Sequence, residues 1–389
     1  MALPLSYNVR SLLARWKTTL LAIGGIGLVV AVFLVLLAMV SGFRMVLRTT
    51  GLPQNAIIAQ RGSLSELTSW INRNDASTMM VDERIARDPN GKPLASCETV
   101  VITTAPKRGD GQPANITVRG VRPEAFAVRT GVHVTQGRMF QQGLYEIIVG
   151  EAIQRRVNGL DLGSKIRMQK HDWEVVGLFT AGGSSFESEI WGDQTAIAPA
   201  FQRNGGCESI TLRMKDPAAA PAYNAALKNN PQFQVELKPE IQYYEDQAGS
   251  VAIPLMILAS FVAVVMGIGA VFGAMNTMYA IVAARTREVA TLRALGFSRF
   301  SVLFSFVTES VFLSLVGGAL GCLLAIPANG YTAGTGQTAS FSEIAFAFHI
   351  SGADLVAGMI FAGLMGLAGG LLPAARAARM PISAALREA

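Results

Sequence analysis

The longest apolar run of the chain extends from Gln247 to Ala284, where 38 consecutive residues carry no charge. As a helix rising about 1.5 Å per residue, this run would measure about 57 Å, whereas the hydrocarbon core of a bilayer is about 30 Å thick. Tilt can absorb part of the excess. The run therefore predicts one helix that crosses the membrane and continues as a stalk on one side, with Pro254 at a position where a kink could form.

Three further apolar runs, at 18–43, 300–326 and 355–375, are each long enough to cross a bilayer. The first contains 21 apolar residues and exceeds the core of a signal peptide, so we expect an uncleaved anchor. The expected organisation is a lead-in at 1–17, span 1 with a stalk at 18–52, an outside domain at 53–245, stalk and span 2 at 246–284, a connecting helix at 285–299, span 3 at 300–326, a short outside loop at 327–352, span 4 at 353–375 and a tail at 376–389.

The outside domain shows both strand and helix patterns, separated by Pro and Gly, which predicts a mixed α+β fold. Strand-like runs occur at 55–60, 99–104, 115–121, 146–149, 165–169, 173–179, 209–214 and 233–237. Helical patterns occur at 65–72, 151–157 and 218–228. The fold class is therefore four transmembrane helices with an α+β extracytoplasmic domain inserted between spans 1 and 2.

The segment that joins spans 2 and 3 has the pattern of a short amphipathic helix. Val289, Leu292 and Leu295 recur every three residues and form an apolar stripe. The charged residues Arg285, Arg287, Glu288 and Arg293 occupy much of the remaining surface. Gly296 is a natural stop for this helix, and Ser298 is a natural cap for the next one. From the pattern alone, a solvated connector with positive-inside arginines is an equally good interpretation.

The distribution of lysine and arginine predicts the orientation of the spans. The chain is 51% hydrophobic and 15% charged, between a soluble and a fully membrane-embedded protein. The lead-in, the connecting helix and the tail together carry ten basic and two acidic residues, whereas the loop at 327–352 has no lysine or arginine. Both termini and the connecting helix are therefore expected to be cytoplasmic. The net charge of +6 reflects this topology and gives no support for nucleic-acid binding.

The sequence ARTREVATLRALGFS at 284–298, followed by Glu309 and by GGALG at 317–321, closely resembles the MacB/FtsX-type ABC transporter permeases. The end of the chain, GGLLPAARAAR at 369–379 and MPISAALR at 380–387, is also typical of that family. The resemblance implies that 285–299 is the coupling helix that docks on a cytoplasmic ATPase, and that the lead-in also touches this ATPase.

The outside domain resembles the MacB-type periplasmic core domain through VRGVRPEAF at 118–126, GRMF at 137–140, IVG at 148–150, LG at 162–163 and VVG at 175–177. This family has two lobes, one inserted in the other. The resemblance places the inserted lobe at about 122–205 and the first lobe on both flanks, at 53–121 and 206–245.

The resemblance implies an inner-membrane ABC permease that transmits ATP-driven motion to its periplasmic domain and exports or extracts a lipid, lipoprotein, peptide or amphipathic drug. The implied partners are a cytoplasmic ATPase, a second permease protomer, identical or not, membrane lipid, a periplasmic adaptor and an outer-membrane channel. The alternative is FtsX-like signalling to a cell-wall hydrolase without transport. A third possibility, a membrane-anchored sensor, leaves the coupling motif unexplained.

No catalytic or metal-binding motif is evident in the sequence. It contains no G-x-x-x-x-G-K-[ST] phosphate loop, so ATP and Mg are expected on a partner ATPase, with no cofactor bound by this chain. MacB itself carries its ATPase on the same chain, and this sequence departs from that pattern. The histidines, His133, His171 and His349, lie too far apart for metal-ligand spacing.

Two groups of polar residues are further candidates. Glu309 lies about ten residues into span 3, where an ionisable side chain is costly; we expect it to brace the coupling helix through hydroxyls or an arginine. In the segment at 182–193, three acids surround an aromatic residue. They could form a contact surface for a periplasmic partner or a strand end with a core tryptophan and solvated acids. The candidate contact residues are Glu187, Glu189, Trp191 and Asp193.

Cys97 and Cys207 are both predicted to lie outside the cytoplasm, where disulfides persist. They fall on the two flanks that would form the first lobe. Two interpretations remain open at this point: a disulfide across these flanks, or two buried free thiols.

Overall fold

Residues 16–336 and 343–380 are described in a computed structural model, and the chain divides into two compact units. Among the described residues, the helical unit comprises 16–42, 254–331 and 347–380. The α/β unit comprises 43–253, 332–336 and 343–346. Most of the predicted lead-in and most of the tail therefore lie outside the described residues.

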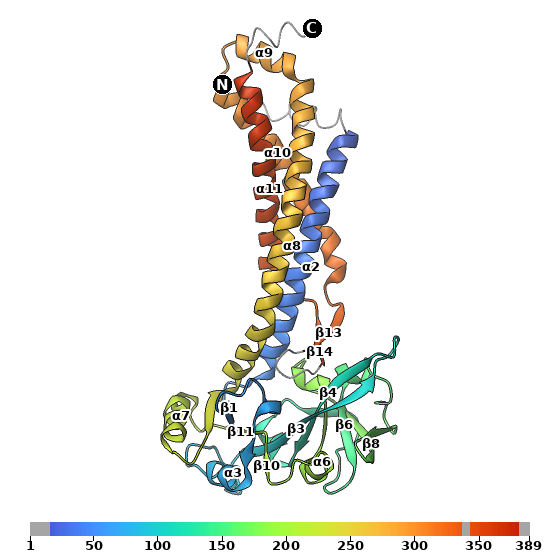
Figure 1. The fold of residues 1–389 in the computed structure, drawn as a ribbon, viewed down its shortest axis with the longest axis vertical. Helices are drawn as coiled ribbons and strands as arrows, with labels where there is room; N and C mark the ends of the chain where they lie inside the picture. Colours follow the sequence, from blue (N-terminus) through green and yellow to red (C-terminus); the bar gives the residue numbers. More distant parts are fainter. Residues whose placement is uncertain (1–15, 337–342, 381–389) are drawn as a thin grey trace. The chain divides into compact units, whose positions relative to one another are not determined.

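Within residues 16–336 and 343–380, four helices are long and apolar enough to cross a membrane by length and composition (Figure 1). They are α2 (Trp16–Thr50), α8 (Glu240–Ala284), α10 (Arg299–Ala325) and α11 (Gly352–Arg379). The short helix α9 (Thr286–Ala294) lies between α8 and α10 in the chain. Ser298 caps α10 by accepting a hydrogen bond from the backbone N–H of Ser301, as the sequence predicted.

Helix α8 begins at Glu240, six residues before the predicted boundary, and runs unbroken through Pro254. The prediction was wrong there because it treated the charged residues near 240–246 as the end of the domain. An acidic residue is favourable in the first turn of a helix, and Tyr243 and Tyr244 bury their rings in the α/β unit. Helix α11 likewise continues four residues beyond the predicted end at 375.

Small residues allow the helices of the helical unit to pack closely. A Cβ atom on Gly321 of α10 would lie 2.5 Å from the carbonyl oxygen of Gly27 on α2. A Cβ atom on Gly366 of α11 would lie 2.0 Å from the hydroxyl of Ser314 on α10. Substitution of either glycine would therefore force two helices apart.

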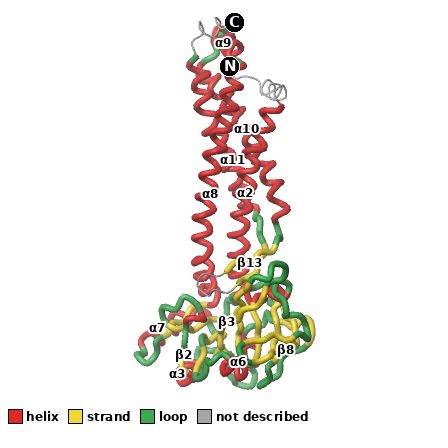
Figure 2. The backbone as a smooth tube through the Cα atoms, turned by 45° about the vertical axis from the view of Figure 1, so that its right-hand side comes forward, coloured by secondary structure: helices red, strands yellow, loops and turns green. Residues whose placement is uncertain are grey.

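The α/β unit is built on one ten-stranded sheet with short helices packed on it (Figure 2). The strand order is β12-β1-β11-β3-β4-β9-β6-β8-β5, and β7 pairs with β8. The pairs β4–β9 and β6–β8 are parallel and the others are antiparallel. The strands are β1 (Asn55–Gln60), β3 (Ala95–Pro106), β4 (Pro113–Val121), β5 (His133–Gly137), β6 (Glu146–Gly150), β7 (Lys165–Met168), β8 (His171–Thr180), β9 (Glu189–Asp193), β11 (Ser209–Arg213) and β12 (Val235–Pro239).

Two small two-stranded sheets and several short helices complete the α/β unit. The strand pairs are β2 (Ile71–Asn72) with β10 (Gly206–Cys207), and β13 (Thr332–Gly336) with β14 (Glu343–Ala347). The α-helices are α3 (Arg73–Met79), α4 (Glu124–Val128), α5 (Glu151–Gln154), α6 (Gln194–Ala200) and α7 (Ala220–Asn229). The 3₁₀ turns are η1 (Glu66–Thr68), η2 (Ser185–Ser188) and η3 (Pro217–Ala219), and η4 (Ile326–Ala328) extends α10 in the helical unit.

Two separate hydrophobic cores lie along the sheet, and strand β3 contributes to both. One core is formed by buried residues from both flanks, such as Ile58, Ile210 and Leu237. The other begins with Val101 in the second half of β3 and extends to Ile197. The predicted boundary of the inserted lobe at 122 was therefore too late, because β3 pairs with β11 over its first residues and with β4 over the rest.

Each predicted strand-like run overlaps a strand, but the predicted helix at 65–72 is wrong. This segment forms the turn η1 and strand β2, because tertiary contacts outweigh its local helical pattern. The side chain of Glu66 enters a buried ion pair, and the hydroxyl of Ser69 accepts a hydrogen bond from the N–H of Gln60. The predicted loop at 327–352 contains β13 and β14, which the sequence pattern did not indicate.

Candidate functional site

Helix α9 is anchored in the helical unit by its inner face. Val289 lies 5% exposed in a hydrophobic cluster with residues from the ends of α8, α10 and α11, among them Ile281, Phe306 and Ala377. Gly296 follows α9 with a φ of +95°, a backbone conformation that favours glycine, and turns the chain toward α10. The sequence pattern predicted both this apolar contact and the glycine stop.

A buried ion pair joins the start of α9 to α10. Arg285 donates a hydrogen bond from Nη1 to Oε2 of Glu309 at 2.9 Å, and both residues are buried. The guanidinium also lies 6.0 Å from the centre of the Phe306 ring. At the other end of α9, Arg293 donates a hydrogen bond of 2.7 Å to the carbonyl oxygen of Ala378 in α11. Of the two kinds of partner expected for Glu309, hydroxyls or an arginine, the structure shows an arginine.

The opposite side of α9 is open to solvent. Arg287, Glu288 and Gly296 are exposed, and Leu295 is 72% exposed. Leu292 and Arg293 lie half-buried between the two sides. The predicted stripe through Val289, Leu292 and Leu295 is therefore incomplete, because α9 ends at Ala294 and the helical repeat no longer orients Leu295 inward. The exposed set offers one basic, one acidic and one apolar side chain to a partner.

The predicted contact surface around Trp191 is wrong, because its four side chains are buried in the described structure. Trp191 is fully buried, and Glu187, Glu189 and Asp193 are each at most 9% exposed. Asp193 accepts hydrogen bonds from the N–H of Gly143 and the hydroxyl of Thr195. These acids are therefore not solvated either; strand β9 carries them into the interior.

Glu187 and Glu189 stabilise different parts of the α/β unit. Oε1 of Glu187 accepts hydrogen bonds from the backbone N–H groups of Ala181 and Gly183, both at 2.8 Å. It therefore fixes the turn between β8 and β9. Glu189 instead belongs to a buried cluster of charges centred on Arg119, to which it is joined by two hydrogen bonds.

Arg119 on β4 uses all five of its N–H donors in this cluster. It forms two hydrogen bonds with Glu189, two with Glu66 and one with Glu98, at distances of 2.8–2.9 Å. A second buried arginine, Arg129, is paired with Glu98. Bidentate arginine–carboxylate pairs of this kind are among the strongest polar contacts in proteins.

The same cluster reaches the ends of two long helices within the α/β unit. Oε1 of Glu240, the first residue of α8, lies 3.8 Å from Arg129, and its Oε2 accepts a hydrogen bond of 2.9 Å from the N–H of Leu52. The hydroxyl of Thr50, the last residue of α2, is 3.1 Å from that of Ser185 and accepts a hydrogen bond from the Ser185 N–H. The charge cluster at Glu240 and the hydrogen bonds between Thr50 and Ser185 together fasten the adjoining ends of α8 and α2 to the sheet.

Sequence reasoning missed this cluster, although one signal was present. Arg119 interrupts an otherwise buried strand, where an arginine is expected only if it is paired. Its partners, Glu66, Glu98 and Glu189, are far from it in the chain, and only the fold brings them together. A single arginine within an apolar strand could have indicated a buried ionic centre. It could not have indicated which carboxylates pair with it.

Two buried glutamates of the α/β unit have opposite ionisation properties. Burial acts to raise the pKa of Glu66, but Arg119 and Arg129 outweigh it and lower that pKa to about 2. Burial raises the pKa of Glu208 to about 7, because its nearest cation, Arg203, lies 3.5 Å away and is partly exposed. The neighbouring charges, rather than burial itself, decide whether the pKa of a buried glutamate rises or falls.

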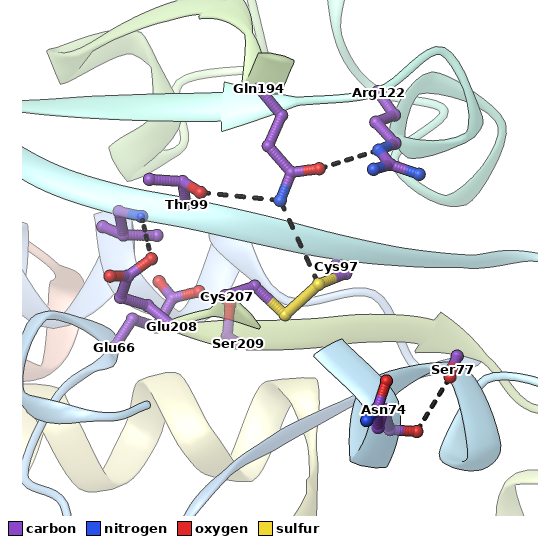
Figure 3. Close-up of a disulfide and its surroundings, with 11 residues drawn as sticks. Glu66, Asn74, Ser77, Cys97, Thr99, Arg122, Gln194, Cys207, Glu208 and Ser209 are labelled. Carbon is purple, nitrogen blue, oxygen red and sulfur yellow. Dashed lines mark hydrogen bonds between the residues drawn. A yellow bond between two sulfur atoms is a disulfide. The ribbon is translucent and has the colours of Figure 1, made fainter. Parts of the chain in front are cut away.

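Cys97 and Cys207 form a disulfide in the structure, with their Cα atoms 5.7 Å apart (Figure 3). The bond links the first half of β3 to β10 and so joins the two flanks of the first lobe. Cys207 also belongs to the core of that lobe. Cys322 in α10 is a free cysteine.

Both parts of the chain match models of known protein families. Residues 19–230 match the family model of the MacB-like periplasmic core domain, and residues 260–382 match that of the FtsX-like permease C-terminal. Among curated proteins, the macrolide export ATP-binding/permease protein MacB of Bordetella avium (strain 197N) is 26% identical over 326 residues, which cover 79% of this chain and 48% of that protein. MacB 2 of Yersinia pestis bv. Antiqua (strain Antiqua) is 26% identical over 366 residues, covering 84% and 52%.

The chain thus spans about half the length of the curated relatives it matches. Among solved structures, the periplasmic region of MacB from Actinobacillus actinomycetemcomitans matches 50% of this chain and 92% of its own, with a TM-score of 0.37 and 14% identity. The periplasmic core model alone covers more than half of the chain. Taken together with the permease match at 260–382, this means that the chain belongs to the family of MacB-like and FtsX-like ABC transporter permeases.

Proposed function

We propose that this chain is the permease subunit of an ABC transporter whose ATPase is a separate cytoplasmic chain that binds ATP and Mg and docks on α9. One observation carries the proposal: α9 is braced from inside, by the Arg285–Glu309 pair and by the hydrogen bond from Arg293 to α11, while its outer residues Arg287, Glu288 and Leu295 are exposed. A helix held in this way passes a force on its outer side to α10 and α11 instead of bending away.

In this proposal the protein lies in the bacterial inner membrane, with both termini and α9 in the cytoplasm and the α/β unit in the periplasm. The charge distribution supports this orientation, because the three cytoplasmic pieces carry ten basic residues and two acidic ones. The chain works as a dimer, with an identical or a related second protomer.

ATP-driven closure of the ATPase moves α9, and the long helix α8 carries the movement to the periplasmic domain. Two features support this mechanical transmission. α8 runs unbroken over 45 residues, and its first turn is fastened to the sheet through the charge cluster around Arg129 and Glu240. The cargo is a lipid, lipoprotein, peptide or amphipathic drug, taken from the periplasm or the outer leaflet with a periplasmic adaptor and an outer-membrane channel. Relatives named macrolide exporters favour export.

The first test is to purify the tagged protein from its native membranes in mild detergent and to identify what accompanies it. We expect an ABC ATPase together with a periplasmic adaptor or an outer-membrane channel. Recovery of an ATPase with a peptidoglycan hydrolase would replace transport by signalling. Recovery of no ATPase, under conditions that preserve a known ABC complex, would contradict the proposal.

A second test addresses α9 directly. Replacement of Arg287 and Glu288 by alanine removes the exposed charges. It also removes the 4.0 Å ion pair of Glu288 with Arg285, but it keeps the Arg285–Glu309 and Arg293–Ala378 bonds, so we expect loss of ATPase association with normal folding. The matched control is Thr291→Ala, an exposed position on the same helix. Equal ATPase recovery with the double variant and the control would refute the role of this surface.

A further inference from the structure

A second feature of the α/β unit, a groove of about 370 Å³ between α3, α6 and the segment at 203–206, has no part in the proposed coupling. Three arginines line it: Arg73 on α3, Arg122 after β4, and Arg203 after α6. All three are exposed. We call this feature the arginine groove. Its size falls within the range of small-molecule sites, roughly 300–1,000 Å³.

The electrostatic field of the arginine groove is one-sided. Among the described residues that line it, none is an aspartate or a glutamate. Arg203 is partly neutralised by Glu208, at 3.5 Å. Arg73 and Arg122 form no ion pair with a carboxylate in the described part of the chain. The groove therefore presents unbalanced positive charge, which attracts an anion.

Arg122 is held in place by a neutral partner. Its Nε donates a hydrogen bond of 2.8 Å to Oε1 of Gln194, a residue that is 5% exposed. The amide nitrogen of Gln194 lies 4.0 Å from Sγ of Cys97, so the disulfide forms the support behind it (Figure 3). Because the amide partner carries no negative charge, it does not offset the positive charge of the guanidinium, and the two Nη groups are left for a bidentate contact with phosphate or carboxylate.

The rest of the lining mixes polar and apolar residues. Ser77, Gln194, Thr195 and Asn204 are polar, whereas an apolar strip is formed by Ala76 on α3, Met80 directly after it, Ala198 and Pro199 on α6, and Cys97. A cationic edge beside an apolar strip suits a ligand with a charged head and a short apolar tail, since each part then meets a matching surface.

We propose that the arginine groove binds a small anionic amphiphile, a molecule with a phosphate or carboxylate head and a short apolar tail. The head contacts Arg73 and Arg122, and the tail lies against Met80 and the disulfide. This site is independent of the proposed coupling function, because its occupancy requires neither ATP nor an ATPase. Failure of one proposal therefore leaves the other unaffected.

The test uses the full chain in nanodiscs of neutral lipid and isothermal titration calorimetry, with protein-free nanodiscs as the blank. Hexyl phosphate is the probe for the head and tail together, inorganic phosphate for the head alone, and hexyltrimethylammonium for a tail with the opposite charge. We expect saturable binding of hexyl phosphate, binding of inorganic phosphate at least fivefold weaker, and no competition from the cation.

The charge-reversing double variant Arg73→Glu/Arg122→Glu should weaken hexyl phosphate binding at least tenfold. Gln194→Leu, which keeps both arginines but releases Arg122, should weaken it several-fold. The matched control is Arg167→Glu, an exposed arginine of the same unit that does not line the groove. Cooperative thermal unfolding of each variant serves as the check that it is folded.

Three results would overturn the proposal. The first is absence of saturable hexyl phosphate binding to the wild-type protein. The second is equal affinity of the folded double variant and Arg167→Glu, which would mean that the groove is not the site. The third is inorganic phosphate binding as tightly as hexyl phosphate, which would mean recognition of a bare anion instead of an amphiphile.

Discussion

Two buried charge sites, one in each unit, are built in different ways. In the α/β unit, Arg119 satisfies five donors with three carboxylates, and Arg129 extends the cluster to α8. In the helical unit, a hydrogen bond of 2.9 Å joins Arg285 to Glu309. Loss of one member of the cluster leaves several buried charges without a partner, whereas loss of Arg285 or Glu309 affects only one. The first site is suited to a permanent joint, and the second braces α9 against α10 through one contact.

Breaking the cluster should have the largest effect on stability. Arg119→Met removes the common partner of Glu66, Glu98 and Glu189, and we expect a loss of about 3–5 kcal/mol in the free energy of unfolding of the α/β unit. The measurement is urea unfolding of the purified protein, followed by the fluorescence of its tryptophans, including the buried Trp191.

The control for this experiment is Arg167→Ala. Arg167 forms an exposed ion pair with Asp172, and such pairs contribute about 0–1 kcal/mol. If Arg119→Met and Arg167→Ala unfold at the same urea concentration, the cluster is not the joint that its geometry indicates.

The disulfide offers a covalent comparison within the same unit. Replacing both Cys97 and Cys207 by serine should lower stability by about 2–4 kcal/mol, because the bond closes a loop of 110 residues. Peptide mass spectrometry under non-reducing conditions should find the two cysteines linked in the wild-type protein. Detection of both as free thiols would contradict the prediction.

The pair in the helical unit should show a smaller, reciprocal effect. Arg285→Glu and Glu309→Arg should each reduce ATPase association, and the double exchange should recover part of it, with a coupling energy of about 1–3 kcal/mol. A double-mutant cycle on ATPase recovery measures this energy. Normal association and transport in Glu309→Ala would show that the brace is dispensable.

Glu208 is a buried acid whose nearby arginine, Arg203, is partly exposed, in contrast to the fully buried arginines of the cluster. Its folded pKa, raised to about 7 from an ordinary value near 4.5, means that the folded state binds a proton between these pH values and the unfolded state does not. Stability should therefore fall by about 1–2 kcal/mol as the pH rises from 5 to 7. Glu208→Gln should abolish this slope, and an unchanged slope would assign it to another group.

Glu66 makes stability depend on pH in the opposite direction. Its folded pKa of about 2 lies below the ordinary value, so its contribution is present above pH 4.5 and is lost as the pH falls toward 2.

Sequence reasoning predicted the long apolar helices and the apolar stripe that buries Val289, because each depends on a local pattern. An arginine was one of the two kinds of partner expected for Glu309, because a buried carboxylate in an apolar helix requires one. It failed where the partner is distant in the chain. The acids of the Trp191 segment look like surface residues until β9 brings Glu189 beside Arg119. The start of α8 was misplaced for a related reason. The charges near 240 suggested a solvent-exposed segment, because the sequence does not show that Glu240 has a buried partner in Arg129.

The strand β3 has a practical consequence for dissecting the molecule. Its first residues pair with β11 and its later ones with β4, so the backbone of one strand is shared by the two hydrophobic cores. A fragment cut at 122 would lose two strands of the second core and should be insoluble, whereas one that begins before Ala95 retains them. In hydrogen exchange, the amides of β3 should be among the slowest in the unit, and both lobes should open together through a single rare event.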